Sequence, residues 1–466
     1  MVRIARVRGR SGWSSTSPPS RRAARRRPAN ATRPYPESVR TPDLSATRGR
    51  KRSHLGIASQ VSGSQLLLAA SGYIVLAMGG QLLNPVSFAA VTSFYLLLNT
   101  IGRGLCAAIE LHLTRAVAHD RSIGRSLAVA RRVGIQQTAA LLGLALVVVI
   151  LASPVITRSF AQDVLLTALL AAAMPGMAYA YLQRGLLAGS RRYGRYALSF
   201  IVEGITTLVF GGAMLTFGVH DRYWWALALM CGSIVSVLTL WTLSLRGPTG
   251  ENTVTRPVSS GRKRDTTSAA AAPDLVWSVV VLTCVQGVWN LAPVILTWRL
   301  AATPEVAAGF TSMALILRVP VLLFPAAQAL LLPVLTANAE SARARLRAVS
   351  PRVIAAGICV VALWGFGATV VVPVVVRVVF GQHAVPSTAV ALILAAASVL
   401  GGGGQLLQTA LVAQGRYRRS GLGWVSALVV LVLLGTLLPA SDLLASVSLA
   451  AATLTTVLVF IPRTNR

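Results

Sequence analysis

The chain has 466 residues, of which 54% are hydrophobic and only 12% are charged, and its formal net charge is +31. Its mean hydropathy is +0.66. So few charged residues do not cover the surface of a water-soluble domain, which excludes an ordinary soluble enzyme and a soluble basic nucleic-acid-binding protein.

The first 54 residues form a separate Arg-rich tail with 15 Lys and Arg and no apolar run to fold around. We expect it to be disordered and cytoplasmic, and to bind anionic lipid headgroups. Nucleic-acid contact is disfavoured because no aromatic residues are interleaved to stack on bases. A misassigned start codon is a further interpretation. A twin-arginine export signal is rejected because the first apolar segment begins too far along the chain.

Twelve apolar stretches follow, each long enough to cross a bilayer of about 30 Å as a helix. In lipid they must be helices, because no backbone group can be left without a partner. The sequence therefore predicts an all-α polytopic membrane protein with about twelve transmembrane helices, at residues 55–78, 85–112, 133–156, 164–188, 196–218, 224–245, 274–298, 307–335, 353–377, 387–414, 421–438 and 442–461.

The positive charges predict the topology. The tail, the alternate loops and the C-terminus together hold 38 Lys and Arg, whereas the opposite loops hold four. By the positive-inside rule both termini lie in the cytoplasm, as an even helix count requires. The expected location is the cell membrane, with a six-helix bundle at 55–245, a cytoplasmic linker at 246–273, a second bundle at 274–461 and a cytoplasmic C-terminus at 462–466.

The two bundles look like copies of each other. A shift of 219 residues aligns the second helix with the eighth, placing Thr92 and Ser93 on Thr311 and Ser312. A shift of 225 aligns the fourth helix with the tenth, placing Leu182 on Leu407. Six helices is an even number, so the repeats are parallel and related by an axis along the membrane normal, an arrangement typical of transporters.

Helix-breaking residues recur at corresponding positions of the two repeats. The fourth helix contains Pro175 and Gly176, and the tenth contains Gly401 and Gly402. Where the second helix has Gly102 and Gly104, the eighth has Pro320 and Pro325. Interrupted helices at matching positions point to the substrate path. The alternative is that these glycines only allow close helix packing.

Two segments carry a resemblance to a known family: NPVSFAAVTSFYLLLNTIGRGLCAAIELHLTRAVA from Asn84, and LQRGLLAGSRRYGRYAL from Leu182. They look like the polysaccharide flippases, or polysaccharide biosynthesis transporters, of the multidrug/oligosaccharidyl-lipid/polysaccharide exporter superfamily. The resemblance implies two six-helix bundles around a central cavity, and alternating access. It also implies transfer of an undecaprenyl-diphosphate-linked oligosaccharide to the outer leaflet, with a polysaccharide polymerase and glycosyltransferases as partners.

Ionisable residues inside the membrane are costly and therefore mark candidate sites. Arg103 and Arg318 fall inside helices, and their planar, permanently charged donors match phosphate oxygens. We expect both to bind the diphosphate, with Asn99 beside them. Spacings of four and seven place Asn99, Arg103 and Glu110 on one face, and Glu110 is expected at headgroup level. The alternative for each arginine is an ion pair with Glu110 or Glu203.

Glu203 lies about 10 Å inside the fifth helix. It is either a proton or sodium coupling site or the partner of an arginine. Arg184 is expected to reach the headgroups and to be structural. The four cysteines share no close spacing, so they indicate packing rather than a metal or redox site, and no cofactor is expected.

The predicted function is that of a flippase for a polyprenyl-diphosphate-linked oligosaccharide in cell-surface polysaccharide synthesis. A cation-coupled multidrug exporter of the same superfamily is an alternative, disfavoured because drug cations need an acidic cavity. A non-transporting membrane scaffold is another. A membrane enzyme is disfavoured because catalytic carboxylates or histidines need a sizeable outer loop, and these loops are short.

Overall fold

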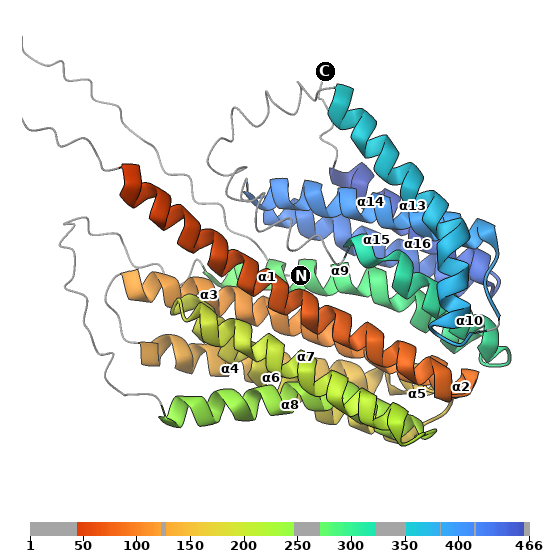
Figure 1. Ribbon diagram of the computed structural model, residues 1–466, viewed down its shortest axis with the longest axis horizontal. Coiled ribbons are helices and arrows are strands. Elements are labelled where there is room, and N and C mark those ends of the chain that lie inside the picture. Colours follow the sequence, from red (N-terminus) through yellow and green to blue (C-terminus); the bar gives the residue numbers. More distant parts are fainter. Residues whose placement is uncertain are drawn as a thin grey trace, which may run out of the picture. The chain divides into compact units, whose positions relative to one another are not determined.

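A computed structural model gives the structure of the protein and describes residues 44–122, 127–246, 271–321, 351–382, 384–413 and 416–460. Residues 1–51 and 52–466 form two compact units, and the membrane helices belong to the second. In the described ranges all regular secondary structure is helical (Figure 1). Residues 1–43 of the expected tail, residues 247–270 of the expected linker at 246–273, the expected C-terminus at 462–466 and Pro325 lie outside them.

The N-terminal half of the chain supplies nine helical elements in its described residues, one of them a π-helix, η1. Their bounds are α1 Leu44–Leu82, α2 Pro85–Asn99, η1 Thr100–Cys106, α3 Ala107–Ser122, α4 Leu127–Leu151, α5 Ser153–Ser159, α6 Val164–Gly189, α7 Tyr193–Thr216 and α8 Arg222–Arg246.

The described elements of the C-terminal half are α9 Ala271–Arg299, α10 Pro304–Leu317, α13 Pro351–Val378, α14 Thr388–Ala413, α15 Tyr417–Leu437 and α16 Asp442–Phe460. Helix α1 begins at Leu44, inside the segment expected to be disordered up to residue 54. The last strong helix breaker before it is Pro42, so the chain leaving the membrane has no reason to stop being helical sooner.

The expected number of membrane helices is confirmed. Eleven described helices are long and apolar enough to cross a membrane, and the shorter apolar α10 occupies the place of the expected eighth. Eleven of the twelve expected stretches match these spans closely, and residues 322–335 of the eighth lie outside the described ranges. The second stretch is longer than expected, because α2, η1 and α3 together form one span from Pro85 to Arg121.

Local sequence signals begin two of these helices. The Asn84 side chain accepts a hydrogen bond from the Ser87 N–H at 2.8 Å, and Pro85 stands at the first helical position. Asp163 caps α6 by accepting from Leu165 N and Leu166 N, and its second oxygen pairs with Arg222 Nη2 at 2.6 Å. This ion pair joins the starts of α6 and α8 at one end of the molecule.

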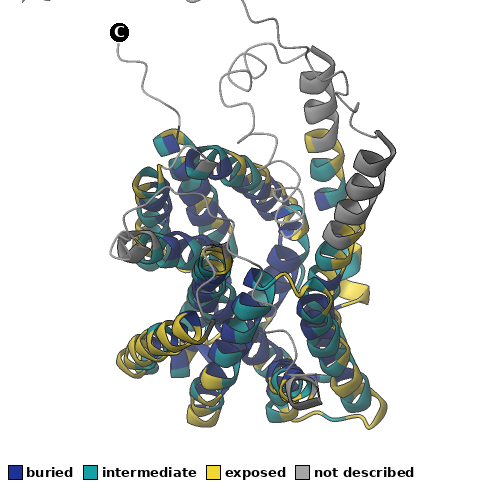
Figure 2. Ribbon diagram, turned by 90° about the vertical axis from the view of Figure 1, so that its left-hand side faces the viewer, coloured by how far each residue is buried: buried dark blue, intermediate teal, exposed yellow. Residues whose placement is uncertain are grey.

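Burial separates helices that face lipid from helices that form the interior. In α4 and α13 only 17% of the spanning window is buried, whereas the figure is 61% for the span from Pro85 and for α9. The outward faces carry exposed apolar side chains such as Leu151, Leu363 and Phe366, and in Figure 2 the exposed positions run along one side of several helices whose other side is buried. This pattern is the one a hydrocarbon environment favours.

Two large buried apolar clusters form the core of the described residues. One is built mainly from the N-terminal half around Phe88, Phe94 and Trp225, and the other lies within the C-terminal half around Trp289 and Trp424. Helix α9 joins the two halves, because it packs on α15 and α16 and also on α2, η1 and α3. Side chains on α9 therefore reach both halves.

Candidate functional site

The π-helix η1 shapes the middle of the second membrane span. Its wider turn covers Thr100–Cys106 and contains Arg103. Small residues let neighbouring helices approach it: a Cβ on Gly104 would lie 2.9 Å from the Thr283 Cα of α9, and one on Gly102 would lie 2.3 Å from the Met177 Cε of α6. Single π turns within α-helices frequently mark functional positions, and here the turn carries a predicted site residue.

Asn99 and Arg103 line the same pocket, of about 520 Å³, inside the N-terminal half. Side chains from five spans surround it: Leu68, Ser71, Gly72, Tyr95, Leu98, Asn99, Gly102, Arg103, Met177, Tyr181, Glu203, Thr207, Leu229 and Ser233. Asn99 donates to Tyr95 O at 2.9 Å. Arg103 is half-buried and has no hydrogen bond or ion pair with any residue that the structure describes, so it lines the pocket without being paired to an anion.

Glu110 does not share this face, contrary to the sequence-based expectation. The expectation assumed 3.6 residues per turn from Asn99 to Glu110, but the π-helix between them has wider turns. Glu110 instead accepts a hydrogen bond from the Tyr196 hydroxyl at 2.6 Å, and Gln65 Nε2 donates to that hydroxyl at 3.3 Å. These contacts lie between α1, α3 and the first turn of α7, and the expected headgroup-level position of Glu110 stays a prediction.

Glu203 is paired with Arg184, and not with Arg103 or Arg318, the two arginines that the sequence analysis weighed as its partner. Arg184 Nη2 contacts Glu203 Oε2, and Ser233 donates to Glu203 Oε1 at 2.8 Å. The guanidinium also donates to Ser199 Oγ at 3.1 Å and lies over the Phe200 ring at 4.1 Å. Arg184 is 1% exposed, so it does not extend to the headgroups. Glu203 still lines the pocket beside Arg103.

Arg318 is buried and held by neutral groups. It follows the last residue of α10, at a turn that separates α10 from the helical residues 319–321. Its Nε donates to the Tyr73 hydroxyl of α1, and its Nη1 donates to Asn290 Oδ1 of α9 and, at 3.5 Å, to Trp289 O. It is 6% exposed. In the described part of the chain neither Glu110 nor Glu203 pairs with it.

Tyr73 connects the two predicted arginines. It binds Arg318 directly, and both Arg318 and Arg103 lie within electrostatic range of its hydroxyl. The second and eighth spans are also linked through α9: Asn290 Nδ2 donates to Thr100 Oγ1 of η1 at 2.9 Å, while its Oδ1 accepts from Arg318. The structure thus brings Arg103 and Arg318 to one region.

The predicted helix breaks are only partly present. The turn at Arg318 interrupts the eighth span two residues before Pro320. The prediction was wrong for Pro175 and Gly176 and for Gly401 and Gly402, because α6 and α14 continue through them without interruption. The carbonyl freed by a proline is tolerated when neighbouring groups satisfy it.

Gly401 has a packing role instead. A Cβ at this position would lie 2.0 Å from the Trp289 ring, so glycine makes room for that indole, whereas a Cβ on Gly402 would meet nothing within 4 Å. The alternative interpretation, that glycine allows close helix packing, thus holds for Gly401. Since Trp289 precedes Asn290, this contact also positions the residue that binds Arg318.

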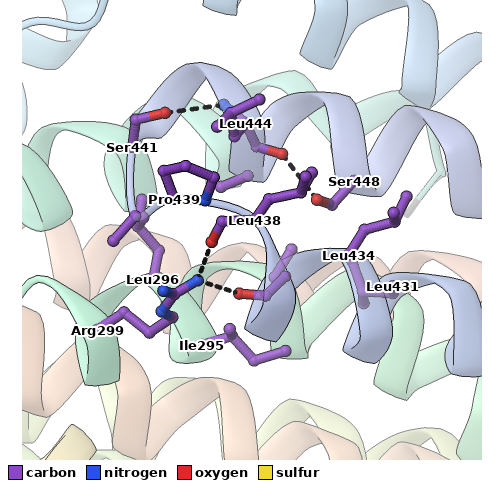
Figure 3. Close-up of a pocket in the computed structure, with 14 residues that line it drawn as sticks. Ile295, Leu296, Arg299, Leu431, Leu434, Leu438, Pro439, Ser441, Leu444 and Ser448 are labelled. Atoms are coloured by element: carbon purple, nitrogen blue, oxygen red, sulfur yellow. Dashed lines mark hydrogen bonds between the residues drawn. The ribbon is translucent and has the colours of Figure 1, made fainter.

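A second pocket, of about 320 Å³, lies between the ends of α9, α15 and α16 (Figure 3). Arg299 Nη1 donates there to Gly435 O at 3.1 Å and to Leu438 O. These bonds satisfy the last carbonyls of α15, so this arginine is a helix-end contact. Among the described residues no cluster of three or more His, Cys, Asp or Glu is arranged to hold a metal ion.

Tyr73, Thr100 and Asn290 were missed by the sequence analysis. Each is a polar residue within an apolar span, which is a detectable signal, but Thr and Tyr are common in membrane helices, and apart from Asn99 the candidates were chosen among charged residues. Asn290 is the strongest of the three signals, because a fully buried amide must find partners.

Comparison with known proteins shows the fold. No protein-family model and no curated protein sequence matches the chain. Among solved structures it is similar to a multidrug resistance MATE family transporter of the MOP superfamily in an inward-facing conformation, with a TM-score of 0.61, 14% identity, and 86% of this chain and 95% of that chain covered. An outward-facing MATE structure has a TM-score of 0.53, with 15% identity and 86% and 93% coverage.

The lipid II flippase MurJ, in an inward closed conformation, has a TM-score of 0.57 and 10% identity, with 86% of each chain covered. The chain therefore has the fold of MOP-superfamily transporters and is a multi-pass membrane protein. These identities show the fold alone.

Proposed function

We propose that the protein is a transporter that flips a lipid-linked oligosaccharide carrying a diphosphate, by alternating access. One observation carries the proposal: Arg318, a buried cation at an interrupted membrane helix, is surrounded in the described residues by neutral partners only. A buried charge without a counter-ion is unfavourable, and an anionic substrate group supplies the missing charge.

Arg103 supports the same substrate class. It faces the N-terminal pocket without an anionic partner, because Glu203 is taken by Arg184 and Glu110 by Tyr196. Arg103, Arg184 and Arg318 together outnumber the two glutamates in the described membrane interior.

Replacing Arg318 and Arg103 by Ala tests this function in proteoliposomes that contain a fluorescent undecaprenyl-diphosphate glycan. We expect flipping to fall about tenfold or more in each variant, because each loses charge-assisted hydrogen bonds. Arg318→Lys keeps the charge without the planar fork and should restore activity only partly.

Arg418→Ala, an exposed arginine of α15, is the matched control and should flip the lipid at the wild-type rate. Size-exclusion chromatography establishes that each variant is folded. Wild-type flipping by both folded Ala variants would contradict the assignment.

A cation-coupled multidrug exporter is the second candidate. The observation in its favour is that Glu203 lines the pocket in a fold shared with multidrug resistance MATE transporters. Efflux of a cationic dye from proteoliposomes, driven by an imposed proton or sodium gradient and abolished in Glu203→Gln, would support it over the flippase.

A further inference from the structure

A chain of hydrogen bonds joins four helical elements from both halves of the protein. Tyr73 of α1 binds Arg318 at the end of α10, Arg318 binds Asn290 of α9, and Asn290 Nδ2 donates to Thr100 Oγ1 of η1 at 2.9 Å. Two of its three bonds, Tyr73–Arg318 and Asn290–Thr100, cross from one half of the chain to the other. We call these four residues the inter-half network.

The network lies deep in the membrane region. At about 1.5 Å per residue, Tyr73 and Asn290 are each roughly 14 Å from the nearer end of their helices, Leu82 and Arg299, and Arg318 is roughly 21 Å from the start of α10. With a hydrocarbon core of about 30 Å, these positions are near its middle. Asn290 is fully buried, so water does not compete for these bonds.

The neutral partners of Arg318 bind its guanidinium more weakly than a phosphate would. A phenol hydroxyl and an amide oxygen accept from the guanidinium without carrying a charge of their own, whereas a phosphate brings the opposite charge and accepts two parallel bonds from one guanidinium. Tyr73 and Asn290 already use Nε and Nη1. A phosphate that binds these donors must therefore displace one or both neutral partners.

Loss of the contacts that Arg318 makes with Tyr73 and Asn290 weakens the connection between the two halves. Without the Arg318 bond, α1 is no longer tied to the end of α10, and the Asn290 amide that bridges to Thr100 loses the cation that fixes its Oδ1. A ligand that binds one arrangement more tightly than another shifts the equilibrium toward it. Here the favoured arrangement is the one in which Arg318 has left Tyr73.

We propose that the inter-half network is a lock that holds the two halves together without substrate and that a diphosphate opens by taking over Arg318. The proposal rests on the proposed function, since it takes Arg318 as the diphosphate contact. It adds that the same side chain senses the substrate and releases the halves. Binding and conformational change are coupled through one guanidinium.

Distance measurements between spin labels test the lock in the full chain in nanodiscs. The four native cysteines are replaced by Ser, and labels are placed at the exposed positions Gly194 of α7 and Arg418 of α15, one in each half. Inorganic pyrophosphate and, separately, undecaprenyl diphosphate are the probes, and calorimetry measures pyrophosphate binding. In the unmodified network we expect each probe to shift the greater part of the distance distribution.

Tyr73→Phe and Thr100→Val remove single hydrogen bonds while keeping side-chain shape. We expect both to show the probe-bound distance distribution without a probe. They should also bind pyrophosphate about tenfold more tightly, because less of the binding free energy is used to break the lock. Tyr179→Phe is the matched control: its hydroxyl accepts a hydrogen bond from Gln183 Nε2 of the same helix at 2.8 Å, so no bond between the halves is lost and its distribution should equal the wild type.

The possible outcomes distinguish the lock from the diphosphate contact. Wild-type distances in both Tyr73→Phe and Thr100→Val would overturn the lock. Pyrophosphate binding that is lost in Arg318→Ala, but leaves the wild-type distances unchanged, would also overturn the lock while leaving the diphosphate contact intact. Equal binding by wild type and Arg318→Ala would overturn both, because Arg318 would then not be the contact.

Discussion

Arg103, Arg184 and Arg318 in the described membrane region differ in the groups that surround their buried or half-buried charge. Arg184 has a carboxylate, a hydroxyl and an aromatic face around it. Arg103 faces a pocket, and Arg318 has only neutral partners. The residue with the most complete set of partners is the one best explained by structure alone. The other two are the ones that we assign to substrate.

Glu203 is the residue for which structural and functional roles overlap, since it pairs with Arg184 and lines the pocket. If it is a coupling site, Glu203→Gln should abolish the dependence of transport on a proton or sodium gradient. Flipping measured with and without an imposed gradient checks this, and Glu305→Gln, at the start of α10, is the control. An unchanged gradient dependence would exclude Glu203 from coupling.

The contribution of the Arg184–Glu203 ion pair to stability is tested by separate variants. Removing one partner of a buried ion pair costs about 3–5 kcal/mol, whereas replacing both by apolar residues is often neutral. The double variant Arg184→Leu/Glu203→Leu should therefore be more stable than Glu203→Leu in a thermal unfolding assay, yet also lack coupling. A double variant that is no more stable than Glu203→Leu would refute the ion-pair account.

At the scale of helices, winding and close packing decide where side chains point. The π turn at Thr100–Cys106 separates Glu110 from Asn99 and Arg103, which a regular helix would have kept on one face. Gly401 lets the Trp289 indole pack against α14. Neither feature interrupts a helix, although the glycine and proline pattern suggested interruptions.

Neighbouring glycines of α14 give a sharp test of this packing. Gly401→Ala should destabilise the protein by about 1–3 kcal/mol, because the added methyl overlaps the Trp289 ring. Gly402→Ala should be neutral or stabilising by roughly 0.5–1 kcal/mol, because its Cβ enters open space and alanine favours a helix. Thermal unfolding in detergent measures both, and equal melting temperatures would show that Trp289 does not need Gly401.

At the scale of the whole molecule, the halves also meet at one end of the helices. Gln81 Nε2 at the end of α1 donates to Val378 O and Val379 O at 2.7 and 2.8 Å, and Phe88 packs edge-on against Phe380 at 6.4 Å. The charge distribution predicts that this end faces outward. We therefore expect the structure to represent a state closed to the outside.

Gly80→Val tests this contact, because a Cβ at Gly80 would lie 2.3 Å from Phe380 O. The larger side chain should separate the halves at this end. Spin labels at the exposed positions Phe217 of α7 and Leu437 of α15 should then report a longer distance. Gly212→Val, at a position with open space in α7, is the control. An unchanged distance in a folded Gly80→Val variant would mean that the contact does not hold this end closed.

Much of the fold was predictable because lipid allows so few solutions. Each apolar stretch had to be a helix, so the spans from Pro85 and from Val164 were found from length and composition alone. The charged residues inside these spans could also be identified from the sequence. Their partners were not, because spacing along the chain pointed to Arg103 or Arg318 for Glu203, whereas its partner is Arg184, which lies on a different helix from Glu203.

The sequence by itself determined that this protein is a bundle of about twelve membrane helices and that a few charged side chains enter it. The reason is that backbone hydrogen bonding in lipid depends on local apolar length. Only the tertiary structure decided which arginine is neutralised and which is held by neutral groups. Arg318 meets Tyr73 across 245 residues, and Asn290 meets Thr100 across 190, so helix packing rather than any local pattern sets these contacts.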